Sequence, residues 1–187
     1  MPEPAQPRRP DVYVVDLIGG IEKRHLEVVD YDSSWPEDFI EHRNRLAEAL
    51  YEQSVDIEHI GSTSVPGLAA KPIIDIVVVV DDITAEEDYL PQLLATGYVL
   101  RVREPGHRLV RTPELDVHVH IYQKGDAAVM NYLLLRDRLR ADAGDRELYA
   151  RTKRELIVQG FDDMNAYSDA KSEAIAGILA RARASRS

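Results

Sequence analysis

The sequence has no cysteine among its 187 residues. Without thiols there can be no disulfide, no thiolate zinc site and no cysteine nucleophile, so a metal site would have to use His, Asp or Glu side chains. This composition favours a cytoplasmic protein. Long apolar runs are missing too, since none approaches the roughly 20 residues of a membrane span, and the N-terminal residues lack the pattern of a signal peptide. We therefore expect no membrane partner.

Basic residues are scarce relative to acidic ones. The chain has 33 Asp and Glu against 23 Lys and Arg, which gives a formal net charge of -10. Such a field repels polyanions, so we expect no nucleic-acid partner, although a local basic pocket is compatible with it. The length suits a single core. The proline-rich residues 1–10 predict a flexible tail, and residues 11–187 predict one domain.

The hydrophobic pattern predicts an α+β fold. Alternating or β-branched runs predict five strands, at residues 55–60, 73–80, 98–104, 107–112 and 115–122. The last three of these segments are separated by short turn signals, which indicates an antiparallel meander in a mixed or antiparallel sheet. Helical spacing predicts five helices, at residues 34–53, 84–97, 126–142, 145–159 and 168–184.

Two helix starts carry capping patterns. Ser34 is the expected N-cap of the first helix, with Glu37 three residues later. Thr84 and Glu87 repeat this spacing before the second helix, where Pro91 indicates a kink or a late start. From about residue 126 the chain is predicted to be helical to its end.

The stretch "HIGSTSVPGLAAKPIIDIVVVV" places a polar turn between two apolar runs. Gly61 and Ser62 follow the first predicted strand, where backbone N–H groups and hydroxyls could hold a phosphate. The alternative is that the glycines and prolines only shape a long loop. Asp75 lies inside the next run, and a carboxylate among apolar residues must be paired, bound to a metal or turned into a cleft. This is not a Walker loop, because Lys71 is followed by Pro72.

A second polar group lies in "LDVHVHIY". Period-two alternation would place Asp116, His118 and His120 on one face of a strand. Histidines at alternate positions can bind a divalent metal or act as acid and base. The alternative is a polar, solvent-facing side of an edge strand. Whether this face is a functional site or a solvent-facing edge depends on whether the fold brings Asp75 to it.

Two pairs of arginines could clamp an anion. Arg101 and Arg103 would share a strand face, and Arg136 and Arg140 would share a helix face. For any one of these residues the alternative is a surface salt bridge with the abundant acidic side chains.

The segment "EHIGSTSVPGLAAKPIIDIVV" resembles the signature of the GrpB-like family, and "HVHIY", "LLLRDRLR", "YARTKREL" and "YSDAKSEAI" follow in the family's order over about residues 25–180. In some bacteria this module is fused to dephospho-CoA kinase. The resemblance implies a nucleotidyltransferase-like fold, with a mixed sheet flanked by helices and a C-terminal helical part. In that superfamily a Gly-Ser turn holds the nucleoside triphosphate, and carboxylates on adjacent strands hold magnesium.

Carried onto this chain, the resemblance matches Gly61 and Ser62 to the Gly-Ser turn and Asp75 to the first metal carboxylate. The second acid, usually two residues on, is Val77 here. In place of a third acid the chain offers Asp, His and His on a later strand. Such a mixed set would tilt the metal from magnesium toward manganese or zinc. The other possibility is that transfer chemistry is lost and a binding pocket is kept.

These observations lead to one functional hypothesis and two alternatives. We expect metal-assisted nucleotidyl or phosphoryl transfer from a nucleoside triphosphate to a small-molecule acceptor. The alternatives are a non-catalytic module that assists folding or assembly of a partner such as dephospho-CoA kinase, and a metal-dependent hydrolase or ligase. A homodimer is also compatible with the sequence.

The hypothesis assigns three sets of residues. The catalytic set is Asp75, His118 and His120. The ligands of a divalent ion (Mg²⁺ or Mn²⁺, with Zn²⁺ as a further option) are Asp75, Asp116, His118 and His120. The phosphate-binding set is Gly61, Ser62, Thr63, Ser64, Lys71, Arg101 and Arg136.

Overall fold

The computed structural model describes residues 7–20, 27–53, 55–159 and 171–185. Within these ranges the strands are β1 (Asp16–Leu17), β2 (Asp56–Ile60), β3 (Ile74–Val80), β4 (Val99–Glu104), β5 (His107–Arg111) and β6 (Val117–Gln123). They form a six-stranded sheet in the order β1-β4-β5-β6-β3-β2. Strands β3 and β6 run parallel, whereas the other neighbouring pairs are antiparallel. The predicted mixed sheet and meander are confirmed, while β1 was not predicted.

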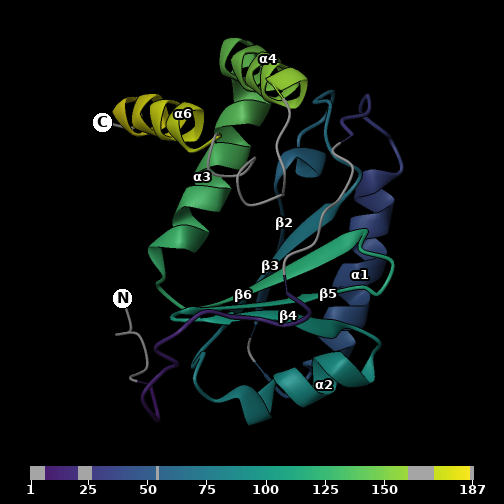
Figure 1. Ribbon diagram of the computed structural model, residues 1–187, viewed down its shortest axis with the longest axis vertical. Helices are drawn as coiled ribbons and strands as arrows, with labels where there is room; N and C mark the ends of the chain where they lie inside the picture. The colour runs from purple at the N-terminus through teal and green to yellow at the C-terminus, as the bar shows by residue number, and fades with distance from the viewer. Residues whose placement is uncertain (1–6, 21–26, 54, 160–170, 186–187) are drawn as a thin grey trace.

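Helices cover both faces of this sheet. The helices are α1 (Trp35–Ala49), α2 (Leu90–Ala95), α3 (Ala127–Ala141), α4 (Ala143–Gln159) and α6 (Ser172–Ala184), with short 3-10 turns η1 (Ser62–Ser64) and η2 (Glu86–Asp88). Figure 1 shows α1 and α2 on the opposite side of the sheet from α3, α4 and α6. The predicted α+β class is confirmed.

The two predicted capping patterns have different outcomes. Ser34 occupies the N-cap position of α1, but its hydroxyl lies 3.3 Å from the carboxylate of Asp38 and makes no cap bond to the backbone. The prediction for Thr84 is wrong, because its hydroxyl donates to Asp82 Oδ1 at 2.6 Å in a local turn. Helix α2 starts late, with Pro91 in its first turn, where a missing N–H is tolerated.

The apolar run of β3 divides between two cores. Ile76 and Val78 face α1 and α2, in a cluster that also contains Trp35 and Leu93. Val77 belongs to the other face, which is covered by α3. Burying each such side chain contributes about 1.5–3 kcal/mol, so the sheet is stabilised from both sides. This explains why the run shows no polar alternation beyond Asp75.

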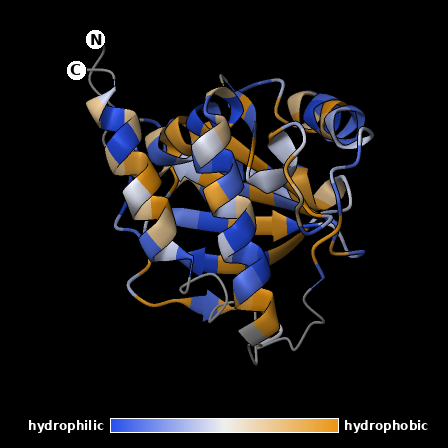
Figure 2. Cartoon of the chain, turned by 90° about the horizontal axis from the view of Figure 1, so that it is seen from above, coloured by the Kyte–Doolittle hydropathy of each residue, from blue (hydrophilic) through white to orange (hydrophobic). Residues whose placement is uncertain are grey.

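The helical part packs against the loop that follows β2. Leu139, Tyr149 and Ile178 form a third apolar cluster with two residues of that loop, Val65 and Leu68. Helix α6 packs against α3, and Figure 2 shows hydrophilic and hydrophobic residues mixed along α6, the helix next to the C label. The helices therefore hold the loop between β2 and β3 in place.

An ion network fixes the helix ends of this layer. The carboxylate of Asp145, on α4, is 5% exposed and accepts from Arg138 at 2.7 Å and from Arg181 at 2.5 Å. Arg138 lies on α3 and Arg181 on α6, so one acidic side chain ties three helices together. In the described part of the chain, no helix combines the length and apolar character needed to cross a membrane.

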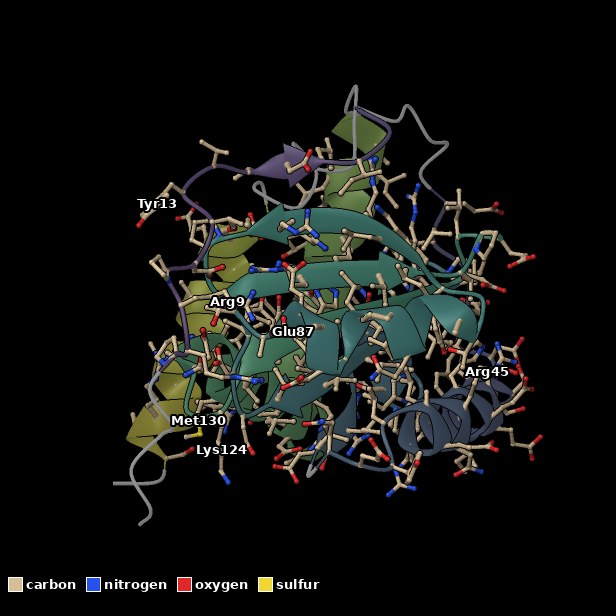
Figure 3. The ribbon with its side chains drawn as sticks, turned by 90° about the horizontal axis from the view of Figure 1, so that it is seen from below. Arg9, Tyr13, Arg45, Glu87, Lys124 and Met130 are labelled. Carbon is tan, nitrogen blue, oxygen red and sulfur yellow. The ribbon has the colours of Figure 1, made fainter. Side chains whose placement is uncertain are left out.

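The N-terminal segment is held by charge. Of the predicted tail, residues 1–6 lie outside the described residues, whereas Arg8 pairs with Asp82 and Asp88 and Arg9 pairs with Glu87. Figure 3 shows Arg9 beside Glu87. These contacts attach the segment to the turn before α2.

Candidate functional site

Three side chains meet at the junction of β3 and β6. The parallel register places Asp75 opposite His118 and Val77 opposite His120, so all three side chains lie on one face. Asp75 Oδ1 is 3.7 Å from His118 Nδ1 and 3.7 Å from His120 Nε2. One ligand atom from each residue lies within 4.8 Å of the others. Ligand atoms of a single ion, each about 2.0–2.6 Å from it, have similar mutual distances.

Asp116 does not join this group. Its Oδ1 accepts the hydroxyl of Thr112 at 2.5 Å, and β6 begins only at the next residue. Leu115 has a φ of +67°, a turn conformation that breaks the period-two alternation just before the strand. The prediction of Asp116 as a metal ligand is therefore corrected.

Asp75 is held as a carboxylate. Burial raises its pKa, but the neighbouring His120, His118 and Lys171 outweigh this and lower the pKa overall. The side chain is 30% exposed, so it faces a cavity rather than the packed core. An ionised Asp between two imidazoles is suited to a cation.

Gly61 allows the loop to approach this carboxylate. Its φ is +70°, and a Cβ added there would lie 2.6 Å from Asp75 Oδ2. Ile60, the residue before it, pairs with Asp75 across β2 and β3. The Gly61–Ser62 turn is thus in direct contact with Asp75, one of the three candidate metal ligands.

The hydroxyls of the η1 turn have different partners. Thr63 donates to the carbonyl of Ile73 and Ser64 donates to the carbonyl of Gly61 at 2.6 Å, so both hydroxyls stabilise the loop itself. Thr63 lines the cavity, whereas Ser64 does not. The assignment of Ser64 to phosphate is corrected, because its side chain closes the turn.

His59 contacts Thr63 of the same loop from β2. Its ring stacks on Phe39, with centroids 4.7 Å apart, and its Nε2 lies 3.0 Å from Thr63 Oγ1. Burial lowers the pKa of His59 to about 4, so the ring is neutral. It anchors the turn and does not face the cavity.

The cavity has a volume of about 390 Å³. Its floor is formed by Gly61, Ser62, Asp75 and the two histidines of β6. Helices α3, α4 and α6 contribute the apolar and aromatic side chains of Leu135, Leu139, Tyr149 and Ile175 to its lining. Four cationic side chains also line it, and they are Lys71, Arg136, Lys153 and Lys171. A space of this size and mixed lining is typical of a small-molecule site.

The two arginines assigned to phosphate have different outcomes. Arg136 lines the cavity, and its guanidinium also contacts Glu58 at 2.7 Å and the carbonyl of His59 at 3.1 Å. Arg101 does not line it, because its guanidinium donates to the carbonyls of Ile18 and Gly20. The assignment of Arg101 is corrected: this side chain holds the turn after β1.

Lys153 is a cavity residue that the sequence did not assign to the site, and Lys171 is another. Lys153 lies on α4, is 3% exposed, and donates to Ser62 Oγ at 3.1 Å and to the carbonyl of Ala69 at 2.5 Å. Burial and the positive charges of Lys171, Arg154 and Lys71 lower its pKa to about 7. In the sequence Lys153 is one of several basic residues on a helix, and nothing there marks it as buried.

This sheet order, with helices on both faces, defines a nucleotidyltransferase-like fold. The structure of Cid1 in complex with its short product ApU matches it with a TM-score of 0.50 and 18% identity, over 67% of this chain and 42% of that chain. The chain belongs to the GrpB family, whose model, described as GrpB protein, matches residues 25–181. The crystal structure of the conserved protein GrpB from Enterococcus faecalis matches with a TM-score of 0.74 and 32% identity, over 83% of this chain and 96% of that chain.

Two curated relatives differ in how much of their length is matched. UPF0157 protein SCO7215 of Streptomyces coelicolor is 63% identical over 179 residues, 96% of each chain. A dephospho-CoA kinase of Mycolicibacterium paratuberculosis is 28% identical over 176 residues, which are 79% of this chain and 43% of that protein. The domain is therefore similar to a whole protein in one case and to part of a longer one in the other.

Proposed function

We propose that this protein is a metal-assisted nucleotidyl- or phosphoryltransferase that acts on a small-molecule acceptor with a nucleoside triphosphate as donor. The observation that carries the proposal is the contact between Gly61 and Asp75, which puts a candidate phosphate turn and a candidate metal group in one cavity. The likeness to Cid1 supports the fold alone.

The donor atoms fit a divalent transition metal. Asp75 supplies carboxylate oxygen, and His118 and His120 supply imidazole nitrogen. Magnesium prefers oxygen ligands in octahedral geometry, whereas manganese and zinc accept imidazole, so this set favours Mn²⁺ or Zn²⁺. When bound, such an ion would act as a Lewis acid on a phosphoryl oxygen.

The chain's own residues would bind and orient the phosphates. Gly61 and Ser62 line the cavity, so the backbone N–H groups of this turn and the hydroxyl of Ser62 would contact the phosphates. Lys71, Lys153 and Arg136 would neutralise the phosphate charge. A buried ammonium such as that of Lys153 gains a counter-charge when an anion enters, which favours binding.

Calorimetric titration of the full chain with each nucleoside triphosphate, with and without Mn²⁺, Zn²⁺ or Mg²⁺, tests this function. We expect metal-dependent binding that Asp75→Asn and Lys153→Met each weaken at least tenfold. Asp116→Asn is the matched control, because Asp116 is an acid just before β6 that accepts from Thr112 outside the group. Absence of any binding heat from folded wild-type protein would refute the proposal.

A second candidate function is a non-catalytic module that assists a dephospho-CoA kinase. The observation that favours it is the match of this domain to 43% of a dephospho-CoA kinase, together with Val77 at the position where the superfamily usually has an acid. This function predicts no nucleotide binding, but a stable complex with a dephospho-CoA kinase from the same cell in analytical ultracentrifugation.

A further inference from the structure

A chain of polar contacts runs from the candidate metal group into the turn between β4 and β5. His120 Nε2 faces Asp75 Oδ1 at 3.7 Å, and its other ring nitrogen, Nδ1, lies 3.1 Å from His107 Nε2. His107 Nδ1 in turn lies 2.6 Å from Glu104 Oε1. Glu104 and His107 have no place in the function proposed above.

The proton positions along this series of contacts follow from Glu104, the residue at its end. An ionised carboxylate can only accept, so the proton between Glu104 and His107 belongs to His107 Nδ1. His107 is 8% exposed, and a neutral ring there leaves Nε2 as an acceptor. His120 must then donate from Nδ1, so in the neutral form of this ring Nε2 carries a lone pair on the side of Asp75.

We propose that Glu104 and His107 are positioning residues that hold His120 in the Nδ1–H tautomer, with Nε2 free to bind a metal ion. This inference rests on the proposed function, in which His120 is a ligand. Metal-binding histidines commonly donate their second ring N–H to a protein acceptor, which fixes the tautomer and the orientation of the ring. Here the acceptor is a second histidine, itself oriented by a carboxylate.

Local structure limits the movement of these rings. Glu104 and His107 are register partners at a hairpin turn that contains Gly106, with a φ of +74°. The ring of His107 stacks on Tyr122 with centroids 4.6 Å apart and on His120 with centroids 5.3 Å apart. The "EPGH" turn therefore places Glu104 and His107 on the Nδ1 side of His120.

Nitrogen NMR of the histidine rings tests the tautomer without metal or nucleotide. In the metal-free full chain, we expect His120 to show a protonated Nδ1 and an unprotonated Nε2, assigned by comparison with His120→Gln. In His107→Phe, which keeps an aromatic ring for the stack but removes both nitrogens, we expect this tautomer preference to be lost. Glu104→Gln retains an acceptor oxygen and should preserve the preference, whereas Glu104→Ala should weaken it.

Titration with Zn²⁺ or Mn²⁺ alone tests the consequence for binding. We expect His107→Phe to lower metal affinity about 10–100-fold. His42→Phe is the matched control, because His42 is a half-buried histidine bonded to Tyr98 outside the cavity, and it should leave affinity within twofold. Far-ultraviolet circular dichroism of each variant verifies that it is folded.

The outcomes separate this inference from the proposed function. An Nε2–H tautomer of His120 in the wild type, or unchanged metal affinity in folded His107→Phe, would overturn the positioning role. So would failure of the wild type to bind either ion. If the tautomer and the affinity loss are found but no nucleoside triphosphate binds, the positioning role stands and the transferase function fails.

Discussion

Gly61 and Asp75 are so close that a methyl group on the glycine would lie 2.6 Å from a carboxylate oxygen. We expect Gly61→Ala to weaken metal binding, because either the loop or the carboxylate must move. The φ of +70° adds backbone strain, so stability should also fall by about 1–3 kcal/mol in urea unfolding. Gly67→Ala is the control, since Gly67 has a φ of +76° and open space around it. Equal effects of both variants would mean that the contact with Asp75 plays no part.

Lys153 should make stability depend on pH. Its pKa is about 7 in the folded protein and near 10.5 when unfolded, so between these values the unfolded state binds more protons. Stability then rises with pH from about 7 to about 10.5, by at most about 1.4 kcal/mol per pH unit. Below pH 7 both states are protonated and this slope disappears. Urea unfolding of wild type and Lys153→Met across pH 6–10 measures the difference, which would be flat if the ammonium titrated normally.

Asp145 should be a main stabilising contact of the helical layer. Its carboxylate is 5% exposed and accepts from arginines of two other helices. Asp145→Asn removes the charge and leaves Arg138 without this partner, so we expect a loss of about 2 kcal/mol, measured by thermal unfolding. Glu41→Gln breaks a solvent-exposed pair with Arg45 and should change stability by less than ~0.5 kcal/mol. A loss as small for Asp145→Asn would show that the helices are held by apolar packing alone.

Arg101 and Arg136 should respond differently to the same substitution. Arg136→Met is expected to lower nucleotide affinity several-fold, because its guanidinium lines the cavity. Arg101→Met should leave affinity within twofold and lower stability, since it removes bonds to the carbonyls of Ile18 and Gly20. Parallel nucleotide titrations and unfolding curves of both variants make the comparison. A larger affinity loss for Arg101→Met would contradict the placement of Arg136 in the cavity and Arg101 outside it.

The strands were predictable because their signal is local. Alternation and β-branched runs marked β2 to β6, and one acid inside an apolar run singled out Asp75. The two-residue strand β1 carries no such signal, because it is too short for a period. Its position depends on the contacts of Arg101, which a sequence pattern does not reveal.

The site was only partly predictable because it depends on tertiary contacts. The alternation of β6 placed His118 and His120 correctly on one face, but the turn at Leu115 removed Asp116 from it. For Ser64 and Lys153 the outcome depends on contacts made in the folded chain. The hydroxyl of Ser64 is bonded to the carbonyl of Gly61 within its own turn, and the packing of α4 on the loop brings Lys153 into the cavity.

The parallel pairing of β3 with β6 also sets the stage of folding at which Asp75, His118 and His120 come together. Parallel neighbours cannot be joined by a tight turn, and here the chain passes through α2, β4 and β5 before it returns. Asp75 and His118 therefore meet only after a loop of about 40 residues has closed. A chain emerging from the ribosome carries Asp75 with neither imidazole until β6 has been made. The proposed metal ligands therefore come together only late in folding, so a bound ion would stabilise the finished sheet rather than start its formation.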